Sequence, residues 1–188
     1  MQERPPISRE DDLDDEDYQV REVYAQFGLT VYKAQVLEKG IVTTTTFAEA
    51  VITGERDPDR FAELYDTLWE ANYALTLGPL LKKFRRLVEN DPKLAAELNA
   101  ALKARNRLAH TFFWEHAEDF MSVPGREDML SELLLLLDRF DDLDKRIDAL
   151  THERVRSKAG WSLDQFSREV DAHVSAARER IAEREART

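Results

Sequence analysis

The most strongly patterned part of the chain is the leucine-rich segment Met129–Ile147, which reads MLSELLLLLDRFDDLDKRI. Its apolar residues recur at intervals of three and four, which is the spacing of one face of an α-helix. We therefore expect this segment to form the most deeply buried helix of the protein. Its longest unbroken apolar run, Leu133–Leu137, is far shorter than the roughly 20 apolar residues that cross a bilayer. We expect no membrane span.

The composition indicates that the rest of the chain is helical as well. The 188 residues include 6 Gly and 6 Pro, about half of their usual combined share, which favours long helices over many short strands. This length is typical of one domain with a substantial core. The absence of cysteine excludes disulfides, thiol nucleophiles and cysteine-based metal sites. The sequence therefore predicts an all-α fold.

Local signals divide the chain into several helices. Asp57-Pro58 and Asp91-Pro92 each pair a capping aspartate with a proline suited to the first helical position. A long helix precedes the first pair, although the β-branched run Thr43–Thr46 leaves a break or a strand open there. Leu77–Pro79 is expected to interrupt the second helix, and Pro124-Gly125 to form the turn before the leucine-rich helix.

The two ends of the chain are charged. Residues 1–17 are rich in Asp and Glu, opposite to the basic start of a secretion signal, so we expect a disordered leader and a cytoplasmic protein. Residues 18–153 form the predicted helical bundle. Residues 161–187 predict a charged amphipathic helix, opened by a capping box at Ser162 and Gln165, whose thin apolar stripe is expected to bind a protein partner. That stripe begins with Leu163, Phe166 and Val170.

The acidic chain contains one basic segment. Its net charge of −11 disfavours contact with nucleic acid if the charge is spread evenly. Residues 82–107, however, hold eight Lys or Arg residues and three acidic ones, and we call this segment the basic island. It is either a set of solvated helix faces or an RNA-binding surface. The candidate RNA-binding residues are Lys82, Arg86, Lys103 and Arg107.

The basic island ends in the motif Arg105-Asn106-x-x-x-His110. Imidazole transfers protons near neutral pH, and guanidinium holds phosphate oxygens through two hydrogen bonds. On a helix Asn106 and His110 share a face, whereas Arg105 and His110 point about 140° apart. Arg105 and His110 would meet through a helix distortion, or through a two-fold axis that joins one chain's arginine to the other's histidine. The alternative is that His110 is an ordinary structural histidine.

In an all-helical chain of this length, the motif resembles the R-x4-6-H signature of HEPN ribonucleases. Thr76-Leu77-Gly78 ahead of it and the leucine-rich helix after it fit the resemblance, which covers roughly residues 20–150. The resemblance implies an up-and-down bundle of four to five helices, here with an extra charged C-terminal helix. It also implies a homodimer that cuts RNA by attack of the 2′-hydroxyl on the adjacent phosphate, without metal or other cofactor. His110 would be the acid or base, Arg105 the phosphate ligand and Asn106 the polar partner.

The resemblance leaves two functions open. Many HEPN proteins are toxins of toxin–antitoxin or phage-defence systems, and others are non-catalytic dimerisation or interaction modules. One toxin branch carries a tyrosine, modified by its antitoxin, where this chain has Phe112, so we do not expect that mode of neutralisation. Phe112, Phe113 and Trp114 are either core residues or base-stacking residues, and we favour the core. His116 lacks the spacing and the third ligand of a zinc site, so we expect no metal.

Overall fold

The computed structural model describes residues 15–87, 91–158 and 175, and within these ranges it contains helices and no strand. The all-α prediction is confirmed. Helix α1 includes three residues of the predicted leader, and the rest of that leader lies outside the described residues. So does the predicted C-terminal helix, except for Ser175. The elements are α1 (Asp15–Ile52), α2 (Pro58–Tyr73), α3 (Leu77–Leu87), α4 (Pro92–His110), α5 (Phe112–Glu115), the 3-10 helix η2 (Asp119–Met121) and α6 (Val123–Lys158).

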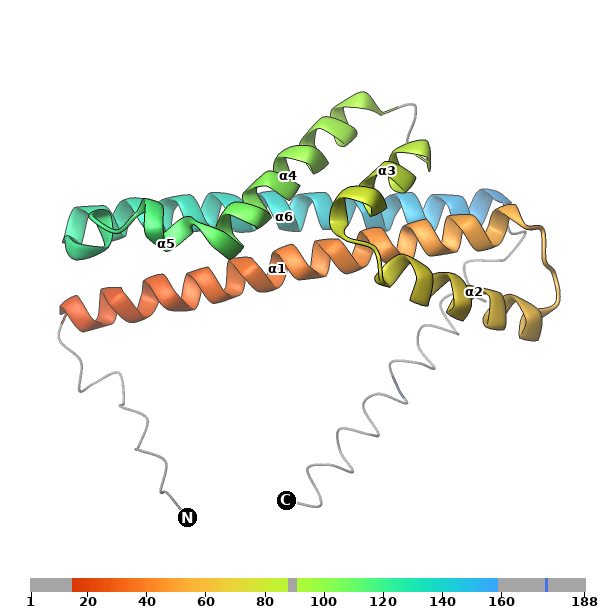
Figure 1. The fold of residues 1–188 in the computed structure, drawn as a ribbon, viewed down its shortest axis with the longest axis horizontal. Helices are drawn as coiled ribbons and strands as arrows, with labels where there is room; N and C mark the ends of the chain where they lie inside the picture. The colour runs from red at the N-terminus through yellow and green to blue at the C-terminus, as the bar shows by residue number, and fades with distance from the viewer. Residues whose placement is uncertain (1–14, 88–90, 159–174, 176–188) are drawn as a thin grey trace, which may run out of the picture.

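The two longest helices, α1 and α6, lie side by side and run in the same direction (Figure 1). Near their starts, the buried Arg126 of α6 donates to Gln19 of α1 at 3.1 Å. In the middle, Lys33 forms an ion pair with Asp141 at 2.6 Å. Farther along, Thr44 and Thr151 join their hydroxyls by a hydrogen bond. These contacts fix the register of the pair along its whole length.

The shorter helices pack on this pair and place α4 across it (Figure 1). Helix α2 turns back along the C-terminal half of α1, where the Phe47 and Phe61 rings meet edge to face at 6.0 Å. Helix α3 packs on α1, and α4 contacts both α1 and α6. Helix α5 and η2 close the end of the molecule at the start of α6. Helix α4 thus connects α3 to α5, and α5 and η2 connect it to the start of α6.

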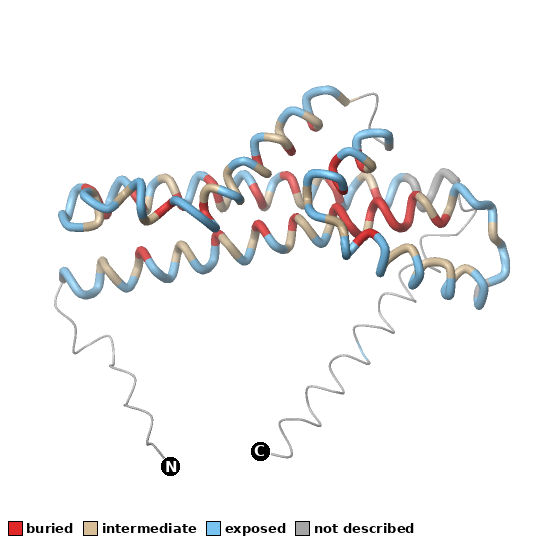
Figure 2. Tube along the Cα trace, viewed as in Figure 1, coloured by how far each residue is buried: buried red, intermediate tan, exposed pale blue. Residues whose placement is uncertain are grey.

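Burial follows the faces where the helices meet (Figure 2). On α6 the buried face repeats every three or four residues, but Leu134 and Leu135 are 46% and 71% exposed. The expectation that the leucine-rich helix is the most buried one is therefore wrong. The most continuously buried stretch is Ile41–Ala50 of α1, because α2, α3 and α6 all pack around it.

The run Thr43–Thr46 does not break α1. Thr43 and Thr45 donate their hydroxyl protons to carbonyl oxygens one turn earlier, at 3.0 and 2.7 Å. Thr46 accepts a hydrogen bond from the Asn72 side chain at 3.1 Å. Tertiary packing and satisfied hydroxyls here outweigh the low helix propensity of β-branched residues.

Both predicted Asp-Pro helix starts are confirmed. The side chain of Asp57 accepts from the Arg60 amide at 3.0 Å, and that of Asp91 accepts from the Leu94 amide at 2.8 Å. Each aspartate thus satisfies one of the amides that have no partner within the helix. The following proline occupies a first-turn position, where a missing amide hydrogen costs nothing.

The two predicted breaks lie at slightly different places. Gly78 and Pro79 lie inside the first turn of α3, and the break falls before Leu77. Pro124 and Gly125 likewise lie in the first turn of α6, whose start is capped by the Ser122 hydroxyl, which accepts from the Gly125 amide at 3.2 Å. Proline is tolerated in a first turn, so these pairs mark helix starts. None of the described helices is long and apolar enough to cross a membrane.

Candidate functional site

The motif lies on the last two turns of α4. His110 is the final residue of the helix and is exposed, and its side chain makes no hydrogen bond within the described part of the chain. The helix is regular up to this point, because the Thr111 amide still bonds to the Arg107 carbonyl at 2.9 Å. Arg105 and His110 of one chain therefore stay about 140° apart. A helix distortion that would bring the two together is absent.

Arg105 contacts α1 and the neighbouring residue on α4. Its Nη2 lies 3.3 Å from Oε2 of Glu38 on α1, and its Nη1 donates to Oδ1 of Asn106 at 3.2 Å. Asn106 is exposed and shares its helix face with His110. The structure therefore joins Arg105 to Asn106, and places Asn106 one turn from His110.

Arg107, a predicted RNA-binding residue, is engaged within the protein. It donates hydrogen bonds to Glu115 and to Glu132 of α6, and its Nη2 lies 3.0 Å from Nε2 of His116. The hydrogen bond with Glu132, followed by that with Glu115, raises the pKa of Arg107 above its usual value. A guanidinium that is neutralised by two carboxylates contributes little charge towards a ligand.

His116 is the centre of a cluster that the sequence did not reveal. Its ring is flanked by Asp119, with Nδ1 and Oδ2 2.8 Å apart, and by Glu132, with Nε2 and Oε2 3.0 Å apart. The side chain is 15% exposed, and the cluster joins the segment between α5 and η2 to α6. The part of the chain that the structure describes holds no set of three side chains suited to a metal ion.

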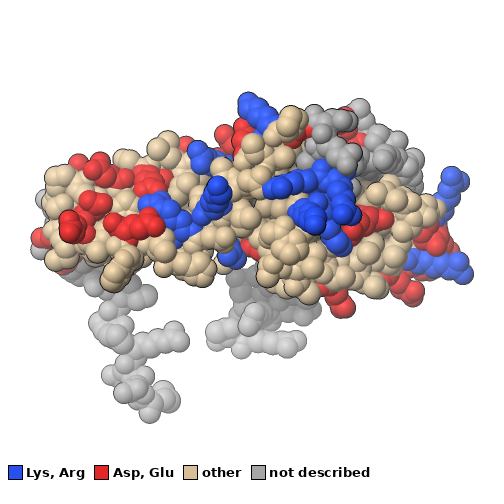
Figure 3. Space-filling model, turned by 45° about the horizontal axis from the view of Figure 1, so that its top comes forward, with Lys and Arg blue, Asp and Glu red and all other residues tan. Residues whose placement is uncertain are grey.

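Among the described residues, some Lys and Arg residues of the basic island form ion pairs with carboxylates, and others do not. Lys83 pairs with Glu49 at 3.2 Å, and Arg105 and Arg107 are paired as described above. Lys82 and Arg86 of α3 and Lys103 of α4 are exposed and form no ion pair with any described residue. Lysine and arginine side chains gather in the middle of one face of the molecule (Figure 3).

One of these exposed cations, Lys103, lies within one turn of the motif, and the others lie on α3, which packs against α4. Arg85 of α3 donates to Asn99 of α4 and so links the two helices. On α4, Asn99, Lys103, Asn106 and His110 follow one another at spacings of three and four, which places them on one face. We call the exposed residues Lys82, Arg85, Arg86 and Lys103 the basic strip. Lys103, the strip residue on α4, shares its helix face with Asn106 and His110.

The three aromatic residues after the motif have different environments. Phe112 is buried, and Phe113 packs against Tyr24 and Phe27 with ring centroids 5.4 and 4.8 Å apart. For these two residues the core assignment is confirmed. For Trp114 it is wrong, because its side chain is 85% exposed.

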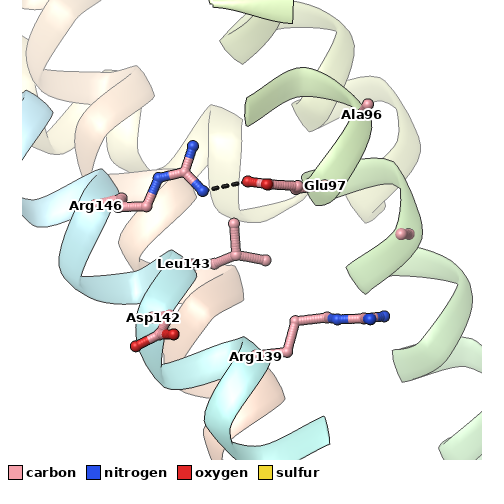
Figure 4. Close-up of a pocket in the computed structure, with 7 residues that line it drawn as sticks. Ala96, Glu97, Arg139, Asp142, Leu143 and Arg146 are labelled. Atoms are coloured by element: carbon pink, nitrogen blue, oxygen red, sulfur yellow. Dashed lines mark hydrogen bonds and ion pairs between the residues drawn. The ribbon is translucent and has the colours of Figure 1, made fainter. Parts of the chain in front are cut away.

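Two cavities of similar volume lie beside α4. One, of about 490 Å³, is a groove between α4 and α6 that contains no residue of the motif. Figure 4 shows Arg146 in this groove bonded to Glu97, and Arg139 extending towards α4. The other, of about 460 Å³, lies between α1, the end of α2 and α4, and Arg105 lines it. Of these two cavities, the second contains a residue of the motif.

The site thus offers an exposed imidazole, a guanidinium held beside an amide, and a row of unpaired cations. Together these groups can hold a phosphodiester and exchange a proton with it. Comparison of the chain with protein-family models, with curated proteins and with solved structures gives no match.

Proposed function

We propose that this protein is a metal-independent endoribonuclease of HEPN type that acts as a homodimer. The observation that carries the proposal is the motif on α4: His110 is exposed on the same face as Asn106, and Arg105 is hydrogen-bonded to Asn106 at 3.2 Å. The basic strip supports it, because its unpaired cations give an acidic protein a local surface for the phosphates of RNA.

The proposed mechanism uses two chains. Because Arg105 and His110 point about 140° apart on a regular helix, one chain cannot bring both to the same phosphate. A two-fold axis beside the exposed end of α4 would bring Arg105 of one chain towards His110 of the other. Asn106 is then placed to orient the imidazole or the guanidinium.

The reaction transfers one phosphoryl group within the RNA. The 2′-oxygen loses its proton to a base and bonds to the adjacent phosphorus, while the bond from phosphorus to the 5′-oxygen breaks. The 5′-oxygen takes up a proton, which leaves a 2′,3′-cyclic phosphate and a 5′-hydroxyl. His110 acts as the base or the acid, and Arg105 stabilises the charge that develops on the phosphate oxygens.

The direct test is cleavage of single-stranded RNA by purified full-length protein. His110→Ala and Arg105→Ala should each lower the rate by about 10²- to 10⁴-fold, the usual contribution of such groups. His152→Ala is the matched control, because His152 is also exposed but lies on α6. Cleavage at the wild-type rate by all three variants, at equal thermal stability, would exclude the proposed mechanism.

A cellular test addresses the proposed role as a toxin or phage-defence component. Expression of the wild-type chain should arrest growth, and His110→Ala should relieve the arrest at the same protein level. Normal growth with abundant wild-type protein would count against this role.

The second candidate is a non-catalytic helical module that binds a protein partner. It is favoured by the apolar side chains at the α5 end of the molecule, where Trp114, Met121 and Val123 are 85%, 78% and 47% exposed. The sequence also predicts a partner for the C-terminal stripe, which lies outside the described residues. This candidate predicts no RNA cleavage, and a complex that is lost when Leu163, Phe166 and Val170 are replaced by serine. An unchanged complex would exclude that surface.

A further inference from the structure

The cavity beside Arg105 combines charged and aromatic groups from three helices. It has a volume of about 460 Å³ and lies between Gln35, Glu38 and Lys39 of α1, Tyr73 at the end of α2, and Arg105 of α4. Its volume is within the range of about 300–1,000 Å³ that is typical of small-ligand sites. Sequence reasoning did not find this cavity, because the three helices meet there only in the folded chain.

The charge of the cavity favours an anion. Arg105 is partly neutralised by Glu38, with 3.3 Å between Nη2 and Oε2. Lys39 is exposed and forms no ion pair with any described residue. Two cations therefore line the cavity with one carboxylate, and Arg105 also presents a planar guanidinium of the kind that binds phosphate through two hydrogen bonds.

The aromatic side of the cavity is the Tyr73 ring, which is ordered by neighbouring rings on α2 but remains exposed. Tyr65, Trp69 and Tyr73 follow one another at single-turn spacing along α2, with ring centroids 6.3 and 6.2 Å apart and planes 22° and 13° apart. Tyr73 ends this row and is 60% exposed. The ammonium group of Lys39 lies 5.9 Å from its ring centroid. An ordered, exposed ring beside two cations suits a ligand that has both a flat aromatic group and a phosphate.

We propose that this cavity is a nucleotide subsite, in which a nucleobase stacks on Tyr73 and the phosphate of the same nucleotide binds Arg105 and Lys39. The inference rests on the proposed function in one respect, since RNA is the expected source of the nucleotide. A free mononucleotide has the same chemistry and is the other source. Because Arg105 belongs both to the motif and to this cavity, a base on Tyr73 would position its phosphate at the reacting arginine.

The test measures binding apart from cleavage. Full-length His110→Ala protein, which the proposed function expects to bind RNA without cutting it, is titrated into a labelled single-stranded RNA hexamer, and fluorescence anisotropy gives the Kd. Adding Tyr73→Ala should weaken binding by about 5- to 150-fold, the usual loss for one stacked base. Adding Tyr73→Phe should leave the affinity within about twofold, since the ring is kept.

Two further variants complete the design. Tyr32→Ala is the matched control, because Tyr32 of α1 is 58% exposed but does not line the cavity, and it should bind RNA like the parent protein. Lys39→Gln should weaken binding and also lower the slope of log K against log salt by about 1, as expected for one lost phosphate contact. Competition by adenosine monophosphate then distinguishes the two sources: displacement shows that the cavity takes a free nucleotide, and its absence shows that it takes a nucleotide within a strand.

The outcomes separate the inference from the proposed function. If Tyr73→Ala binds RNA as tightly as Tyr32→Ala, the subsite inference is wrong. Cleavage of RNA by the wild-type protein would still support the proposed ribonuclease function. If the wild-type chain neither binds nor cuts RNA, the proposed ribonuclease function is wrong. Direct titration of the protein with adenosine monophosphate then tests the subsite inference. If the wild-type protein binds adenosine monophosphate and Tyr73→Ala abolishes that binding, the cavity is a site for a free nucleotide. If adenosine monophosphate does not bind, the subsite inference is wrong.

Discussion

At the scale of single residues, Gly125 and Gly28 show how tertiary contacts decide the effect of one methyl group. A Cβ on Gly125 would overlap the backbone of Asp119, because η2 crosses closely over the first turn of α6. A Cβ on Gly28 would meet nothing within 4 Å, and Gly28 lies on an exposed part of α1. We expect Gly125→Ala to lower the free energy of unfolding by about 1–3 kcal/mol through overpacking. Gly28→Ala should raise it by up to about 1 kcal/mol through helix propensity.

Urea denaturation of both variants checks this prediction. Equal effects of the two substitutions would show that the close contact between η2 and α6 is absent in solution.

Asp141 makes stability depend on pH at acid values. Hydrogen bonds from Lys145 and then from Lys33 lower the pKa of its carboxyl from 3.8 to about 2. Since the folded pKa is the lower one, the ion pairs stabilise the protein fully above about pH 4, and this contribution is lost as the pH falls towards 2. Asp141→Asn should therefore lower Tm at pH 6, and the difference from wild type should shrink on acidification to pH 2.

Thermal unfolding across this pH range is the measurement. Asp138→Asn is the control, because Asp138 is exposed and forms no ion pair with any described residue. A Tm difference for Asp141→Asn that is the same at pH 6 and pH 2 would contradict the assignment.

The sequence predicted the motif residues and their helix faces, but it did not predict the partners of those residues. Spacing alone places Asn106 and His110 on one face, since helix geometry is local. Arg107 was expected to meet RNA, yet Glu132 binds it from a position 25 residues away. Glu38 binds Arg105 from a position 67 residues away. Such contacts depend on how α1, α4 and α6 pack, which no local pattern encodes.

At the scale of helices, starts were more predictable than breaks. The Asp57-Pro58 and Asp91-Pro92 signals act within one turn, through a side chain and the adjacent amides. The sequence therefore predicts these two helix starts correctly. The Gly78-Pro79 and Pro124-Gly125 pairs suit both a turn and the first turn of a helix, and the structure selects the latter. The run Thr43–Thr46 was ambiguous because its helix depends on burial against α2, α3 and α6.

The hydrogen bond between Thr44 and Thr151 joins α1 to α6 and predicts unequal effects of two similar substitutions. Thr151 also donates to the Ile147 carbonyl at 3.0 Å, so the Thr44 hydroxyl is the donor between the two threonines. Thr44→Val removes that donor and leaves no proton unpaired. Thr151→Val leaves the buried Thr44 hydroxyl without its acceptor, and should cost about 1–3 kcal/mol. The double variant should cost less than the sum of the two single variants.

A double-mutant cycle measured by urea denaturation tests this order. Additive effects, or a larger cost for Thr44→Val than for Thr151→Val, would contradict the proposed direction of the hydrogen bond.

At the scale of the whole molecule, the net charge does not describe how the charged side chains are distributed over the surface. The chain carries −11 overall, but much of the basic island is neutralised by carboxylates from other helices, and the unpaired cations of the island lie on α3 and α4. Their position could not be predicted from the sequence, because it depends on which lysines and arginines find partners in the fold. The geometry of the proposed dimer likewise could not be predicted from the sequence, since no local pattern fixes a symmetry axis.

If the proposed active site takes Arg105 from one chain and His110 from the other, two inactive variants should restore each other. After mixing, unfolding and refolding equal amounts of Arg105→Ala and His110→Ala protein, about half of the dimers contain one chain of each kind. Each such dimer has one intact site and one site lacking both groups, so RNA cleavage should recover to about one quarter of the wild-type rate. Refolding each variant alone is the control and should give no recovery. Activity that stays at the level of the separate variants, in a sample shown to contain mixed dimers, would contradict an active site built from Arg105 of one chain and His110 of the other.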